Sequence, residues 1–140
     1  MSSSSWNVNR VRSLLVLALI AALGAACVIV PAMGITPRMS APLFPLLRTA
    51  IEKMTWVPIA ALGVLGLACG IFTYHKPVVI GAASVAVLPL AAFAEMIADP
   101  TSHNMIPFEL AMYAAMGLPA LLMAFLARWM RRGNRVAPAA

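Results

Sequence analysis

The segment EMIADPTSHNMIPFE, from Glu95 to Glu109, separates the last two long apolar runs of this sequence. It contains three of the four acidic residues of the chain and one of its two histidines. A helix needs about 20 apolar residues to cross a hydrocarbon core ~30 Å thick. The apolar runs on either side of this polar segment are long enough for that. We therefore take the segment as the connection between two candidate spans, and as the first place to look for a chemical site.

The composition of the whole chain indicates its class. Hydrophobic residues make up 63% of the 140 residues and charged residues 10%, whereas a soluble domain has about 45–50% apolar and about 25% charged residues. The sequence therefore predicts an integral membrane protein, with residues 1–140 forming a single transmembrane domain. The net charge of +6 does not indicate a nucleic-acid partner. The basic residues flank the apolar runs, where Lys and Arg act as orientation signals.

Four apolar runs are candidates for helical spans, at about 13–33, 56–74, 78–98 and 107–128. Arg10 and Arg12 before the first run also fit the start of a cleaved signal peptide. The run continues through Val28 to Val30, however, beyond the only stretch that resembles a cleavage site. We therefore expect a retained helix and a lipid bilayer around all four spans.

A short amphipathic helix is expected between the first and second spans, at about 41–54. Ser40 is a suitable N-cap, and apolar residues then recur at helical spacing with Arg48, Glu52 and Lys53 between them. This pattern is typical of a helix in the membrane interface, although an early start of the second span would produce it too. The predicted architecture is thus an all-α membrane bundle of four transmembrane helices plus this interfacial helix.

Glycine and proline positions predict how the spans pack. Gly63, Gly66 and Gly70 lie within the second run, and the spacing of the last two lets a second helix backbone approach closely. Pro89 in the third run and Pro119 in the fourth remove helical hydrogen bonds, so we expect each to kink its helix or act as a hinge. The freed carbonyl groups would line a polar gap, or the helices would simply pack bent.

The distribution of basic residues predicts the orientation of the chain. With the N-terminus inside, seven of the ten Lys and Arg residues fall on the inner side. The positive-inside rule then places both termini in the cytoplasm of a multi-pass cell-membrane protein. It also places the segment 95–109 on the outer face.

Glu95, Asp99, His103 and Glu109 form the candidate polar cluster, at the outer ends of the third and fourth spans. Carboxylates near the bilayer are costly and tend to face a partner or a cavity. Four interpretations are open for this cluster: a polar lock between helix ends, a ligand or ion site, a metal site, and a catalytic group that shares protons.

Motifs give little direct indication of an activity. The sequence has no phosphate-binding loop, no dinucleotide motif, no H-E-x-x-H and no C-x-x-C, so no cofactor is indicated. Cys27 and Cys69 are expected at different membrane depths and therefore unpaired. The leading hypothesis is a protein that acts by binding, as an accessory subunit of a partner membrane protein or as a homo-oligomer. The alternatives are a small ion-coupled transporter, and a membrane-embedded enzyme or metal site using Glu95, His103 and Glu109.

Overall fold

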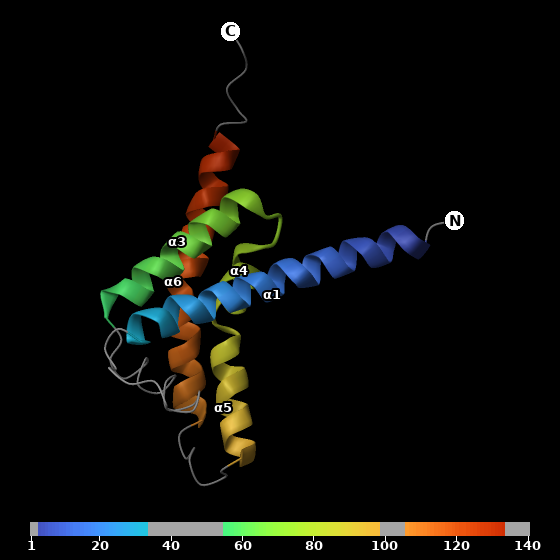
Figure 1. The fold of residues 1–140 in the computed structure, drawn as a ribbon. Helices are drawn as coiled ribbons and strands as arrows, with labels where there is room; N and C mark the ends of the chain where they lie inside the picture. The colour runs from blue at the N-terminus through green and yellow to red at the C-terminus, as the bar shows by residue number, and fades with distance from the viewer. Residues whose placement is uncertain (1–2, 34–54, 99–105, 134–140) are drawn as a thin grey trace.

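The computed structural model describes residues 3–33, 55–98 and 106–133, and every element of regular structure in these ranges is an α-helix (Figure 1). The helices are listed here in chain order: α1 (Ser3–Met33), α3 (Trp56–Phe72), α4 (Pro77–Val85), α5 (Val87–Ala98) and α6 (Ile106–Gly133). The predicted all-α class is confirmed for this part of the chain. The expected interfacial helix at 41–54 lies outside the described residues.

Three helical stretches are long and apolar enough to cross a membrane: Val8–Pro31, Pro77–Ile97 and Pro107–Arg132. This finding fits the predicted helical bundle of a membrane protein. The expected second span is the apolar helix α3, which has 17 residues and is therefore about 25 Å long. That length is somewhat below the ~30 Å thickness of a hydrocarbon core.

The expected third span consists of two helices, because α4 ends at Val85 and α5 begins at Val87. Pro89 explains the position of this break. A proline has no N–H, and its ring crowds the carbonyl four residues earlier, which here belongs to Val85. Ala86 keeps helical dihedral angles, but its N–H bonds to Ala83 O at 3.2 Å, in the tighter i to i−3 pattern. The chain therefore stays helical here but tightens to 3₁₀ geometry at this one residue.

Helix α6, by contrast, continues through Pro119 without a break. Gly117 and Ala120 on either side of this proline are buried. Gly117 lies close to Gly81 of α4, and Ala120 lies close to Gly66 of α3. Packing on both sides therefore keeps α6 helical at a position where the sequence alone predicts a weak point.

Small residues bring the helix backbones together. Gly66 lies against the backbone of Ala120, and a Cβ at Gly70 would be 2.7 Å from Ala127 Cβ. On the other side of the bundle, Gly24 of α1 lies against the backbone of Ser84 in α4. Helices α3 and α4 each pack against both α1 and α6, so these contacts connect the two sides of the bundle. Such close approaches are how helices pack in lipid, where apolar burial provides little driving force.

The charged side chains of the described helices lie at opposite ends of the bundle. Ser13 Oγ lies 3.5 Å from His75 Nε2, and Arg128 donates a 2.7 Å hydrogen bond to Tyr74 O. These contacts gather the start of α1, the turn between α3 and α4, and the C-terminal part of α6. We call this region the basic end. Its members are Arg10, Arg12, Lys76, Arg128, Arg131 and Arg132.

Candidate functional site

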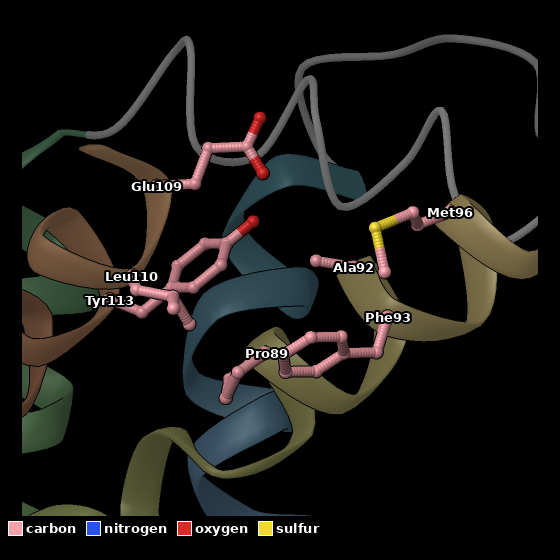
Figure 2. A pocket seen from close by; sticks show the side chains of 7 residues that line it. All are labelled: Pro89, Ala92, Phe93, Met96, Glu109, Leu110 and Tyr113. Carbon is pink, nitrogen blue, oxygen red and sulfur yellow. The ribbon is translucent and has the colours of Figure 1, made fainter. Parts of the chain in front are cut away.

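The two described acidic residues lie at the other end, beside a cleft between α5 and α6. Figure 2 shows the seven residues that line this cleft: Pro89, Ala92, Phe93 and Met96 from α5, and Glu109, Leu110 and Tyr113 from α6. The α5 residues are spaced i, i+3, i+4, i+7, so they occupy one face of that helix. The cleft is small, with a cavity volume of about 10 Å³, which is room for about one water molecule.

Glu109 and Tyr113 provide the polar groups of the cleft. Glu109 is half-buried in the first turn of α6, where the positive end of the helix dipole stabilises a carboxylate. Tyr113 follows one turn later and is only 8% exposed. Figure 2 shows the carboxylate and the hydroxyl on the same side of α6, in the space that also receives the Met96 side chain. A proton donor and a proton acceptor therefore share an otherwise apolar lining.

Glu95 belongs to the same neighbourhood although it does not line the cleft. It is half-buried and precedes Met96 on α5, and both its carboxylate and that of Glu109 interact electrostatically with the Tyr113 hydroxyl. Each glutamate takes part in interactions of its own, so neither is an isolated charge. The structure thus brings two of the four predicted cluster residues to one tyrosine. Asp99 and His103 lie outside the described residues.

Tyr113 is the functional candidate that the sequence interpretation missed. Its aromatic ring is inconspicuous in an apolar run, where it reads as one more lipid-facing or core residue. The available signal is the spacing from Glu109, because residues four apart share a face of a helix. Tyr113 lies four residues after Glu109, so the residue one helical turn after this carboxylate was a candidate on spacing alone.

The cleft residues suit proton sharing or the binding of a small polar group better than metal coordination. Within the described residues no three His, Cys, Asp or Glu side chains gather closely enough to hold a metal ion. Cys27 and Cys69 are both free thiols, as expected, with Cys69 buried and Cys27 half-buried. A metal site that includes Asp99 or His103 remains a prediction.

Of the prolines and glycines singled out from the sequence, Pro89 alone lines this cleft. Pro89 also follows the break between α4 and α5. Pro119 lies in the uninterrupted part of α6. Gly63, Gly66 and Gly70 are all buried, and the last two lie against α6 of the same chain. The Gly66–Gly70 face is therefore occupied internally.

Comparison with models of protein families, with curated proteins and with solved structures found no match.

Proposed function

We propose that this chain is a small polytopic protein of the cell membrane that acts by binding, as an accessory subunit or a homo-oligomer. In this proposal α1, α4 with α5, and α6 cross the bilayer, and the shorter α3 makes a fourth crossing. Trp56, the first residue of α3, and Tyr74, just after its end, would anchor the helix at the two interfaces. The segment 41–54 would lie in one interface.

The orientation proposed for the chain follows from its basic end. Six of its ten Lys and Arg residues are gathered there. Positive charge at the ends of spans favours the cytoplasmic side, so both termini would be cytoplasmic. The cleft between α5 and α6 would then open on the outer side.

The observation that carries the proposal is the small buried share of α1 within the part of the chain that the structure describes. The stretch Val8–Pro31 has the highest mean hydropathy of the three candidate spans, 2.8, yet only 17% of its most apolar window is buried. The corresponding buried shares are 39% and 33% in the other two stretches. The N-terminal half of α1 extends beyond the other helices (Figure 1). An apolar helix with so little internal contact offers a long surface to another membrane helix.

The exposed face of α1, rather than the Gly66–Gly70 face, is the surface that we propose for self-association. The Gly66–Gly70 face packs against α6, so a second copy cannot use it without displacing that helix. Leu15 and Leu19 on α1 are 66% and 59% exposed. An oligomer or a complex with a partner subunit would therefore form through α1.

Photo-crosslinking in native membranes tests this proposal. A photoreactive residue at Leu15 or Leu19 is expected to give a protein adduct in high yield. The same residue at Val64, which is 66% exposed on α3, is the matched control and is expected to label mainly lipid. The mass of the α1 adduct distinguishes a second copy from a different subunit. Lipid adducts alone at all three positions would contradict a binding role for α1.

A second candidate function, a small ion-coupled carrier, is favoured by the cleft itself. Glu109 and Tyr113 line it and Glu95 lies nearby. An ionisable residue inside a span commonly marks a proton or ion pathway. Pro89 and the break at Ala86 would supply the hinge of such a carrier, with Pro119 as a second hinge candidate.

Ion flux into proteoliposomes tests the carrier. The wild-type protein is expected to carry protons or Na⁺ faster than protein-free vesicles. Glu109→Gln is expected to lower that flux more than tenfold, because the amide cannot ionise, whereas Glu95→Gln should lower it less. Leu110→Ala, a change in an apolar lining residue, serves as the control and should keep most of the flux. Flux equal to that of empty vesicles for both ions would eliminate this candidate.

A further inference from the structure

The basic end is a second polar region, which the proposed function uses only to orient the chain. Lys76, in the turn between α3 and α4, lies on the same end as Arg128, Arg131 and Arg132 of α6, whereas the two described glutamates lie at the far ends of α5 and α6. Neither of these two glutamates is placed to neutralise the arginines at the C-terminal end of α6. Such an accumulation of one sign of charge attracts groups of the opposite sign.

Two of the arginines are fixed in place by neutral groups. Arg131 Nη1 donates to Ile71 O at 2.9 Å, and Arg128 Nη2 donates to Tyr74 O and to His75 O. These carbonyls belong to the end of α3 and the following turn, where helical carbonyls lack partners within the helix. The bonds orient both guanidinium groups without cancelling their charge. A guanidinium carries five N–H donors, so each retains donors for an incoming anion.

The aromatic residues around Arg128 and Arg131 indicate how deep these two guanidinium groups would lie in a bilayer. Tyr74 and Trp129 are 89% and 74% exposed, and they lie where apolar helices end. Exposed Tyr and Trp at span ends mark the level of the lipid headgroups. Arg131 Cζ lies 5.8 Å from the centroid of the Tyr74 ring, a cation–π distance. In a bilayer crossed by these helices, the fixed charges would therefore lie at the depth of phosphodiester groups.

We propose that the basic end binds the phosphate headgroups of anionic phospholipids. Arg128 and Arg131 supply oriented donors, and the exposed Lys76 and Arg132 supply further charge around them. Arginine pairs with phosphate through two parallel hydrogen bonds, which favours a held lipid over one that is merely attracted. This inference requires only that the helices cross a bilayer. It depends neither on the partner of α1 nor on ion transport.

Tryptophan quenching by brominated lipids measures this preference. Phenylalanine replaces Trp6 and Trp56, so that Trp129 at the basic end is the single reporter. The protein is reconstituted at low ionic strength in mixtures of phosphatidylglycerol and phosphatidylcholine, with bromine on one lipid at a time. A basic side chain near an anionic surface contributes a factor of about five to lipid binding. The relative binding constant obtained from Trp129 quenching is therefore expected to be at least about fivefold higher for phosphatidylglycerol than for phosphatidylcholine.

A charge-neutral variant and its matched control complete the test. Lys76→Gln with Arg132→Gln is expected to lower the preference severalfold, because two charges are lost while Arg128 and Arg131 remain. Lys76→Arg with Arg132→Lys keeps the charge and should keep the preference. Both positions are exposed, so the variants should fold, which circular dichroism checks. Equal quenching by the two lipids in the parent protein, or undiminished selectivity in the neutral variant, would overturn the proposal.

Discussion

Replacing Gly66 with alanine is expected to destabilise the bundle by about 2–3 kcal/mol, because the new methyl group meets the backbone of another helix. A Cβ at this position would be 2.6 Å from the carbonyl carbon of Ala120. Backbone atoms cannot rotate away as a flexible side chain can, so α3 and α6 would have to separate. The gain in helix propensity from Gly to Ala, up to about 1 kcal/mol, offsets only part of this cost. Unfolding in mixed detergent micelles measures the difference.

Gly63 on the same helix is the matched control for Gly66. A Cβ there would lie 3.5 Å from Met123 Cγ, an ordinary contact with a flexible side chain. Gly63→Ala should therefore leave stability unchanged within about 1 kcal/mol, or raise it slightly. If the two variants unfolded at the same denaturant concentration, the close approach of α3 to Ala120 would be wrong.

Gly24→Leu is expected to detach α1 from α4, with a loss of about 3 kcal/mol or more in the stability of that contact. Even a single Cβ at Gly24 would lie 2.6 Å from the carbonyl carbon of Ser84. Ser84 cannot easily move away from the new side chain, because it is only 1% exposed and its hydroxyl donates to Gly81 O at 2.8 Å. Ile20 and Val28, one turn before and one turn after Gly24, are the other well-buried residues of α1 and would be drawn out of the core with it.

Cross-linking across the basic end reports the position of α1 directly. Ser13→Cys and His75→Cys, introduced after both native cysteines are changed to alanine, should join in high yield through a short thiol reagent. Gly24→Leu is expected to lower that yield more than tenfold. Ala22→Leu places the same leucine side chain at an exposed position of α1 and should leave the yield unchanged. An undiminished yield in Gly24→Leu would show that α1 does not dock through Gly24.

The apolar runs predicted the main helices well but not where they end. The first run suggested a span at 13–33, whereas α1 begins at Ser3, and α6 continues past residue 128 to Gly133. A hydropathy pattern indicates which part of a helix is apolar enough to lie in lipid, but not where the helix begins or ends. A helix can continue through polar residues such as Arg131 and Arg132 until a residue such as glycine ends it.

The proline effects show what the sequence could and could not predict. Pro89 indicated a weak point in the third run, and the break lies at Ala86 because a proline disturbs the preceding turn of the helix. Pro119 has the same chemistry in a continuous helix. The difference comes from the packing of Gly117 and Ala120 against other helices, which a single sequence does not reveal.

The candidate site was predictable only in its charged part. Glu95 and Glu109 stand out because carboxylates are rare in apolar runs. The place of Tyr113 in the cleft and the contact of Gly24 with Ser84 both depend on which helices pack together. A single glycine or tyrosine in an apolar run does not indicate which helix it will contact. The Gly66–Gly70 spacing predicted a close helix contact but not whether the second helix belongs to the same chain.

The break at Ala86 leaves α5 as a separate cooperative unit. Its contacts with α1, α4 and α6 are the sparsest among the packed helices, and Leu90 and Ile97 are 67% and 81% exposed. The hydrogen bond that resumes the ladder beyond the break, from Leu90 N–H to Ala86 O, is 3.4 Å long. Segments held this loosely open sub-globally, at a free energy well below that of global unfolding. One wall of the Glu109–Tyr113 cleft can therefore fluctuate while the Gly66–Ala120 interface stays closed.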